Sequence, residues 1–501
     1  DECFHAYETA LFSRLERQSD PVAQGKSEEH HSHGEEIVLS EIYKVDSLLG
    51  SGGQKDVYKV VQVSTGQSLA LKELKNSHET QRAMMKNEAV LQAQLTHPNI
   101  PIVLSLNDSA SNKPIFVERL VSGMSWADVM DTLSLSENIA LLQTVSKVVA
   151  YVHQQRRIVH GDLKPENVVL GKNGNRYNEV YLVDWGLAVS LDDPELATRM
   201  PCGTMFYMPP ESLGTTQQLV SPATDVFMLG GILYRILTGK APYEDACYLK
   251  GSIKVLSDIE KVLILPIPSR NEQTQDYIPS ELIEIANKAL ERDPNNRYVD
   301  AGAFADALDL YQHRVVLTNR LLKADKTFET LRKRQQSSLT AKSKVPFPIM
   351  ELVENTNEFR LVRQELSATA STDDALYNDA VKAEREARSL LLESALNTRD
   401  YGLTEAQLAL GEELEKSLPR ELASEKTAAL LASFRSRLSS GLAARRRDKL
   451  IKWLTAIALC VIVGQTIWVM KVNADRREEN AIQAAEKVKR DANEAMLRQR
   501  Q

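Results

Sequence analysis

Cysteine is scarce in this 501-residue sequence, which contains only Cys3, Cys202, Cys247 and Cys460. Their scattered spacing excludes a disulfide framework or a cysteine metal site, and is typical of a main domain in a reducing compartment. An excess of basic residues is also lacking, because 61 Lys and Arg stand against 68 Asp and Glu, a formal net charge of −7. A nucleic-acid-binding domain carries a basic patch, so we expect no nucleic acid among the partners.

The length predicts two or three folded units, and 43% hydrophobic with 26% charged residues is typical of globular protein. The acidic excess is concentrated at one end, where residues 1–42 hold ten Asp and Glu against three Lys and Arg. We interpret 1–42 as an acidic N-terminal arm. His30, His31 and His33 lie in it, but no fixed ligand geometry is implied, so a metal site is the weaker interpretation.

Long apolar runs are absent except for one, Trp453–Met470, whose 18 residues carry no charge. Its length and its terminal tryptophans predict a single transmembrane helix; a buried core helix is the alternative. The preceding flank is richer in Lys and Arg than the following one, which places that side in the cytoplasm. We therefore expect a single-pass inner-membrane protein with its main domain in the cytoplasm, and interpret 471–501 as a polar helical extracytoplasmic tail.

Residues 313–450 are rich in Leu, Ala and charge, and apolar residues recur at helical spacing over 374–397 and 403–418. No repeat of fixed period is present, which argues against a solenoid. We interpret 313–450 as a helical juxtamembrane linker. The alternative is a module that forms a homodimer or binds a partner.

Residues 43–312 predict a small β-rich lobe followed by a larger helical lobe. Strand-like segments begin at Tyr43, at 56 and at 67, and more follow near 101–106 and 114–120. Residues 80–95 predict a helix that stops at His97-Pro98-Asn99. After about residue 135, helical spacing dominates until about 312.

The segment HGDLKPENVVL, residues 160–170, places three chemically distinct polar groups in one short loop. Phosphoryl transfer needs an acid that takes the proton of the attacking hydroxyl, a cation near the moving phosphate and an oxygen ligand for magnesium. Asp162, Lys164 and Asn167 supply these groups at the required spacing. Asp184, which follows the apolar strand VYLV and precedes Trp185-Gly186, suits a second metal ligand.

The turn LGSGGQKDVY, residues 49–58, has glycines where a backbone can lie close over phosphates. Val57 follows where an apolar side chain can cover an adenine ring. Lys72 on the next strand suits the α- and β-phosphates, and Glu88 on the following helix would orient it. Each of these two residues alone has a simpler interpretation: Lys72 as a solvated lysine on a strand, and Glu88 as part of a solvated helix face.

Together and in this order, these motifs resemble the eukaryotic-type (Hanks-type) serine/threonine protein kinase family over roughly 43–312. With the single span, the chain resembles its membrane-anchored bacterial branch. The resemblance implies a bilobal α+β fold, with a small β-rich N-lobe and a larger helical C-lobe, followed here by the juxtamembrane region and one transmembrane helix. It also implies transfer of the ATP γ-phosphate to Ser and Thr hydroxyls of protein substrates, with Mg²⁺, or Mn²⁺, as the metal.

The resemblance assigns roles to individual residues. Asp162 is the catalytic base, Lys164 contacts the γ-phosphate, and Asn167 and Asp184 hold the metal. Glu118 begins the hinge that meets the adenine. The full nucleotide-binding set is Leu49, Gly50, Gly52, Gly53, Val57, Ala70, Lys72, Glu88 and Glu118. The resemblance further implies that Glu211 pairs with Arg297, that Asp225 ties the catalytic loop from below, and that Thr204 bonds toward Asp162 and Lys164.

The sequence departs from the family pattern at four positions. Lys55 replaces the third loop glycine, and Gly161 replaces the Arg before the catalytic Asp, which normally receives an activation-loop phosphate. Trp185 replaces Phe in the metal triplet, and Pro209 replaces an Ala. A pseudokinase or ATP-binding scaffold acting through 313–450 is therefore the alternative function. Against it, no residue that touches metal or transfers a proton is missing.

Overall fold

The protein is described by a computed structural model whose chain divides into two compact units, residues 1–313 and 314–501. The structure describes residues 41–51, 55–75, 78–107, 114–173, 176–193, 204–212, 220–250, 262–271, 273–340, 349–368, 374–397 and 429. The acidic arm up to residue 40, the segment 403–418, the apolar run Trp453–Met470 and the tail 471–501 lie outside the described residues.

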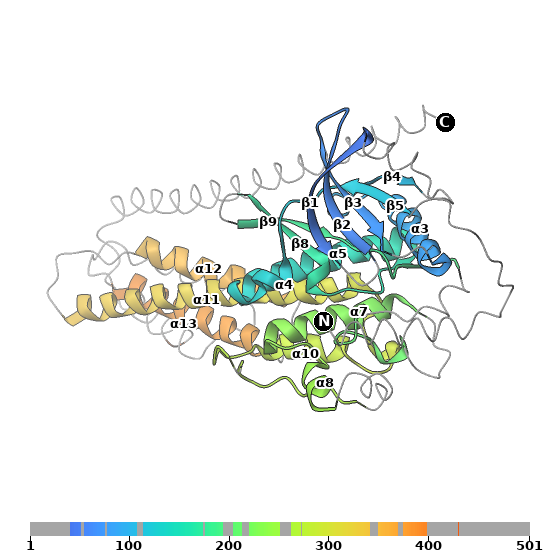
Figure 1. The fold of residues 1–501 in the computed structure, drawn as a ribbon. Coiled ribbons are helices and arrows are strands. Elements are labelled where there is room, and N and C mark those ends of the chain that lie inside the picture. The colour runs from blue at the N-terminus through green and yellow to red at the C-terminus, as the bar shows by residue number, and fades with distance from the viewer. Residues whose placement is uncertain are drawn as a thin grey trace, which may run out of the picture. The chain divides into compact units, whose positions relative to one another are not determined.

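The first unit opens with a five-stranded antiparallel sheet in the order β1-β2-β3-β5-β4 (Figure 1). Its strands are β1 (Tyr43–Ser51), β2 (Lys55–Gln62), β3 (Ser68–Leu74), β4 (Val103–Asn107) and β5 (Ile115–Arg119). Helix α3 (Glu79–Ala93) contributes Met85 and Ala89 to a core that also contains Leu74 and Phe116 of the sheet. The strands and the helix lie close to where the sequence pattern predicted them, so the small β-rich lobe is confirmed.

The helical lobe follows and holds the largest core of the described chain. Its helices are α4 (Trp126–Val129), α5 (Leu135–Arg156), α7 (Pro222–Thr238), α8 (Glu244–Lys250), α10 (Ser280–Ala289) and the start of α11 (Ala301–Thr340). Short strands cross it in two small sheets, of order β6-β8-β9 and β10-β7: β6 (Met124–Ser125), β7 (Ile158–Val159), β8 (Val168–Asn173), β9 (Arg176–Leu182) and β10 (Val189–Ser190).

Helix α7 lies at the centre of this lobe because it is apolar on almost every side. Gly230 allows α10 to come close, since a Cβ added there would lie 2.6 Å from the Cβ of Ala289. The helix begins at Ser221, whose side chain and Thr224 form a capping box, and it ends at Gly239 in the left-handed conformation. The sequence thus sets both ends of the helix and its burial.

An ion pair between Glu211 and Arg297 lies inside the helical lobe and confirms the predicted brace. Arg297 donates from Nη1 to Oε1 at 2.7 Å and from Nη2 to Oε2 at 2.8 Å. The same guanidinium also donates to three backbone carbonyls and lies 4.8 Å from the Phe227 ring centre. This bidentate geometry satisfies both charges away from water.

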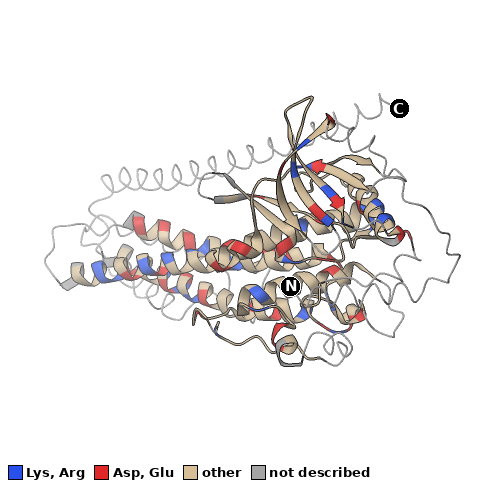
Figure 2. Ribbon diagram, viewed as in Figure 1, with Lys and Arg blue, Asp and Glu red and all other residues tan. Residues whose placement is uncertain are grey.

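The second unit contains the later part of α11, α12 (Ile349–Ser367) and α13 (Ala375–Asn397). These helices enclose an apolar core of their own, in which Phe328 meets Phe359 edge to face. Glu384 is buried in it between Arg363 and Arg388, at 2.6 and 2.7 Å. Blue and red residues both occur along these helices in Figure 2, while the side chains in their shared core are apolar.

Helix α11 runs across the predicted domain boundary near residue 312 and continues to Thr340, within the region that was expected to be helical. No Gly or Pro occurs between Gly302 and Pro346, so nothing in the local sequence stops it. In the described part of the chain, no helix has both the length and the apolar character needed to cross a membrane.

We expect Arg297→Ala to lower the free energy of unfolding by about 3–5 kcal/mol, because it leaves the Glu211 carboxylate buried without its partner. Chemical denaturation followed by tryptophan fluorescence measures this, since Trp126 and Trp185 are fully buried in the first unit. Arg157→Ala is the matched control. The ion pair of Arg157 with Asp192 is exposed, so its loss should cost less than about 1 kcal/mol. Equal effects of the two substitutions would contradict the bracing role.

Candidate active site

The loop between β7 and β8 brings the predicted catalytic residues together around one carboxylate. Asp162 accepts hydrogen bonds from Lys164 Nζ at 2.8 Å, from Thr204 Oγ1 at 2.7 Å and from Asn167 Nδ2 at 3.1 Å. Thr204 in turn accepts from Lys164 Nζ at 2.6 Å, which confirms its predicted bonding. A carboxylate has about four lone-pair sites, so one remains for a substrate hydroxyl while the others fix its orientation.

Asp225 of α7 holds this loop in place from below, as predicted. Its carboxylate is fully buried and accepts the backbone N–H groups of His160 at 2.8 Å and of Gly161 at 2.9 Å. His153 of α5 lies 2.8 Å from the same carboxylate. Gly161 has a φ of +77°, a left-handed conformation that glycine adopts without strain, so this replacement suits the backbone here.

Asp184 and Trp185 follow β9 and face the catalytic loop. Asp184 has a φ of +64°, an uncommon conformation for a residue other than glycine. Trp185 is fully buried with its ring centre 4.5 Å from that of His160, so the bulkier replacement of Phe fits the core. Burial lowers the pKa of His160, which keeps this ring neutral at pH 7. The metal triplet is thereby packed onto the base of the catalytic loop.

The predicted nucleotide-binding residues lie on the first three strands. Gly50 pairs with Val57 across β1 and β2, and Val57 pairs with Lys72 across β2 and β3. Leu49 is half exposed on β1, whereas Ala70 is buried on β3. Gly52 and Gly53 lie outside the described residues. The strand register therefore places the predicted adenine-covering residue beside the predicted phosphate-binding lysine.

Lys72 forms the predicted ion pair with Glu88, Nζ to Oε1 at 3.0 Å, and this pair is almost completely buried. Glu118 of β5 approaches the same ammonium at 3.1 Å and also accepts a 2.5 Å hydrogen bond from Gln92. Because the Glu118 carboxylate is occupied inside the lobe, only its backbone remains for the predicted contact with adenine. Burial would lower the pKa of Lys72, but Glu118 and Glu88 outweigh it and raise the pKa above its usual value.

Lys55 joins the predicted phosphate and metal residues in one network. Its Nζ lies 2.7 Å from Asp184 Oδ1 and 2.8 Å from Glu88 Oε2. Burial would lower the pKa of Lys55, but Asp184 and Glu88 outweigh it and raise the pKa above the usual value for lysine. Burial would likewise raise the pKa of Asp184, but Lys55 and Lys72 hold it well below its usual range. Both side chains are therefore ionised at neutral pH.

Sequence reasoning did not find the bonds of Glu118 to Lys72 and Gln92, nor those of Lys55 to Glu88 and Asp184. A lysine in place of a loop glycine was the visible signal for Lys55, and the sequence analysis named that replacement. Glu118 offered a weaker signal, an acidic residue directly after the apolar run IFV of its strand. Nothing in the local sequence identifies Gln92 as the partner of Glu118, because 26 residues separate the two.

The donor set fits a divalent metal and a polyphosphate. Asp184 is an ionised carboxylate that already pairs with a cation, the ammonium of Lys55. The Asn167 amide nitrogen donates to the Asp162 backbone oxygen at 2.8 Å, which leaves the amide oxygen as the ligand atom. Carboxylate and amide oxygens are the ligands that Mg²⁺ prefers. Lys72 and Lys164 supply positive charge on either side of these oxygens.

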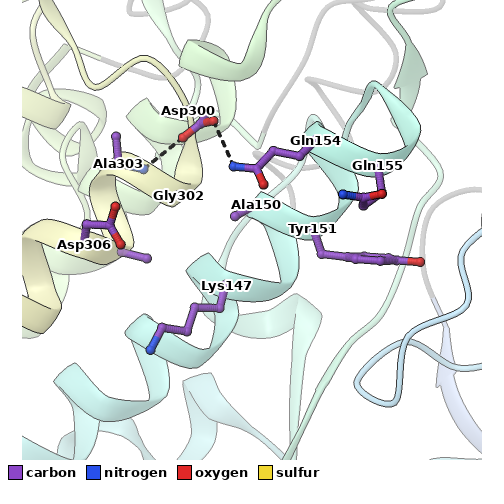
Figure 3. A pocket seen from close by; sticks show the side chains of 10 residues that line it. Lys147, Ala150, Tyr151, Gln154, Gln155, Asp300, Gly302, Ala303 and Asp306 are labelled. Carbon is purple, nitrogen blue, oxygen red and sulfur yellow. Dashed lines mark hydrogen bonds between the residues drawn. The ribbon is translucent and has the colours of Figure 1, made fainter. Parts of the chain in front are cut away.

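A separate hollow of about 550 Å³ lies between α5 and the start of α11 (Figure 3). Asp300 occupies its rim and accepts hydrogen bonds from Gln154 and from the backbone of Ala303. Lys147 forms an ion pair with Asp309. None of the catalytic or nucleotide-binding residues lines this hollow, so it is not the active site.

Comparison with known proteins matches the protein kinase domain family over residues 43–315, more than half of the chain. One similar protein is the serine/threonine-protein kinase pkn2 of Myxococcus xanthus, 29% identical over 54% of this chain and 32% of its own length. PknD of Protochlamydia amoebophila is 28% identical over 55% of this chain and 30% of its own. PknA of Mycobacterium tuberculosis is 30% identical, with 54% of this chain and 62% of that protein covered.

The chain thus spans about a third of the first two relatives and less than two thirds of the third. The sheet order, the helical lobe and the bonds around Asp162 and Asp184 belong to the same segment that the family model matches. The chain therefore belongs to the protein kinase family.

Proposed function

We propose that this chain transfers the γ-phosphate of ATP to Ser and Thr hydroxyls of protein substrates. The observation that carries the proposal is the set of bonds that orient the Asp162 carboxylate next to Lys164 and Asn167. Lys164 and Thr204 match the serine/threonine pattern of the family, and the relatives are named serine/threonine-protein kinases. The pseudokinase alternative is not favoured, because every proton-transferring and metal-binding residue is in place.

The residues of the site divide the work of the reaction. Asp162 accepts the proton of the attacking hydroxyl, while Asn167 and Thr204 keep its carboxylate oriented. Lys164 lies 2.8 Å from this carboxylate and neutralises charge on the phosphoryl group beside it. Asn167 and Asp184 would hold Mg²⁺ or Mn²⁺, which supplies charge neutralisation at the phosphates when bound. The protein contributes mainly position and electrostatics.

We expect Asp162→Asn to reduce phosphate transfer to a generic basic protein by at least about a hundredfold, because the amide cannot take the proton. The full chain is assayed with labelled ATP and Mg²⁺. Asp192→Asn is the control, since Asp192 is exposed and its carboxylate pairs with Arg157 at the surface. Equal labelling by wild type and Asp162→Asn would refute the kinase proposal.

We further propose that the chain is anchored in a bacterial inner membrane by Trp453–Met470, with residues 43–312 in the cytoplasm. The support is the uncharged 18-residue run, its tryptophans and the basic residues before it. The chemistry agrees, because ATP is available on the cytoplasmic side. Helices α12 and α13 lie between the kinase segment and this run in the sequence, as a juxtamembrane region would.

For the anchor, we expect wild type to stay with membranes after an alkaline wash and the double variant Leu459→Arg, Ile462→Arg to be released. Each central arginine costs about 2.5–3.5 kcal/mol of insertion free energy. Leu459→Ile with Ile462→Leu is the matched control and should stay bound, because its hydropathy is unchanged. Release of wild type, or retention of the arginine variant, would count against a spanning helix.

We also propose that the helical region 313–450 brings together two copies of the chain or binds a protein partner. The support is that α11, α12 and α13 enclose their own core, whereas a plain spacer needs none. Two differently tagged copies should co-purify, and deletion of residues 349–397 should abolish this. Dimerisation through this region would be refuted if the deleted chains still co-purified, or if the wild-type chains did not co-purify.

A further inference from the structure

Lys55 is the first residue of β2 and occupies the position at which the family pattern has the third loop glycine. Its ammonium bridges two carboxylates of different function: both oxygens of Glu88, at 3.0 and 2.8 Å, and Asp184 Oδ1 at 2.7 Å. Its side chain remains 19% exposed, and that of Asp184 is 38% exposed. The bridge therefore lies at the open edge of the network, where a nucleotide would enter.

Lys72 is held more deeply. Its side chain is 5% exposed and its ammonium lies between Glu88 and Glu118, at 3.0 and 3.1 Å. The ammonium is also 4.5 Å from the centre of the Phe116 ring, which attracts a cation. An ammonium has three N–H donors, and two buried carboxylates already use two of them. Lys72 thus has little freedom to move toward a phosphate without leaving the buried Glu118 carboxylate without its cation.

Lys55 and Lys72 share Glu88, but they differ in which ion-pair partners they keep when a nucleotide binds. Lys72 keeps Glu118, whereas Lys55 loses Asp184 as a partner when that carboxylate serves a metal. One donor of Lys55 is then free at the edge of the cleft, while Glu88 still fixes the ammonium in place. Negatively charged phosphate oxygens are the acceptors that a lysine freed in this way would bind.

We propose that Lys55 is a second phosphate-binding lysine, which donates to the phosphates of bound ATP while Glu88 positions it. In the nucleotide-free protein, the same ammonium pairs instead with the Asp184 carboxylate, at 2.7 Å. The inference rests on the proposed use of ATP. It adds that the work usually given to the lysine on β3 is shared between Lys55 and Lys72, because Glu118 restrains Lys72.

The test compares binding of two ligands, ATP with Mg²⁺ and adenosine, to the full chain in detergent by calorimetry. Lys55→Ala should weaken ATP binding by about tenfold or more and leave adenosine binding unchanged, because one charge-assisted hydrogen bond to phosphate is lost. Lys59→Ala is the matched control: this lysine lies on the same strand, pairs with Asp46 at 2.7 Å and should change neither affinity. Unchanged ATP affinity in Lys55→Ala, or an equal loss for adenosine, would overturn the proposal.

A second variant separates phosphate binding from simple stabilisation of the lobe. Adding Glu118→Gln to Lys55→Ala releases Lys72 from one carboxylate while the new amide oxygen still accepts from Gln92. ATP affinity should then recover at least about threefold, whereas a merely structural role of Lys55 predicts a further loss. Phosphate transfer is measured separately. Absence of transfer by a wild-type chain that binds ATP would refute the kinase proposal and leave the lysine comparison intact.

Discussion

The fully buried carboxylate of Asp225 is the point on which the active site depends. A carboxylate removed from water must be surrounded by donors, because burying it unpaired costs several kcal/mol. Here the donors are the backbone N–H groups of the catalytic loop and the His153 ring. Because Asp225 would be unpaired if these N–H groups moved away, its burial holds the loop that carries Asp162 in one conformation. Helix α7 can hold Asp225 at that depth because its other residues bury themselves in the largest core of the described chain.

The same constraint recurs at other places in the described residues. Glu211 receives Arg297 in the helical lobe, and Glu384 receives two arginines in the second unit. The pairs Glu211–Arg297 and Arg363–Glu384 join segments that are distant in sequence or on different helices, so each fixes a geometry that apolar packing alone would leave less specific. In the β-rich lobe, Glu88 has a different use. It is buried between two lysines, and one of them also reaches the predicted metal ligand Asp184.

Much of the fold could be predicted from the sequence because its signals are local. Alternation of apolar residues predicted β1 to β3, and helical spacing predicted that helices dominate after about residue 135. The end of α11 could not be predicted, because the boundary expected at residue 312 is a change in the tertiary surroundings of the chain and not in its local sequence. No glycine or proline marks it, and the helix continues to Thr340. The short strands β6, β7 and β10 were also not predicted, since each has only two residues, too few to show the alternation of a strand.

For the site, the sequence by itself determined which chemical groups are present: the spacing of Asp162, Lys164 and Asn167 belongs to one loop and needs no distant partner. It also revealed the unusual residues Lys55 and Gly161, because a family pattern is read position by position. Only the tertiary structure decided what those residues touch. The partners of Lys55 are 33 and 129 residues away, and Glu118 meets Gln92 across 26 residues. Such contacts depend on how the sheet, α3 and the end of β9 approach one another, which no local pattern encodes.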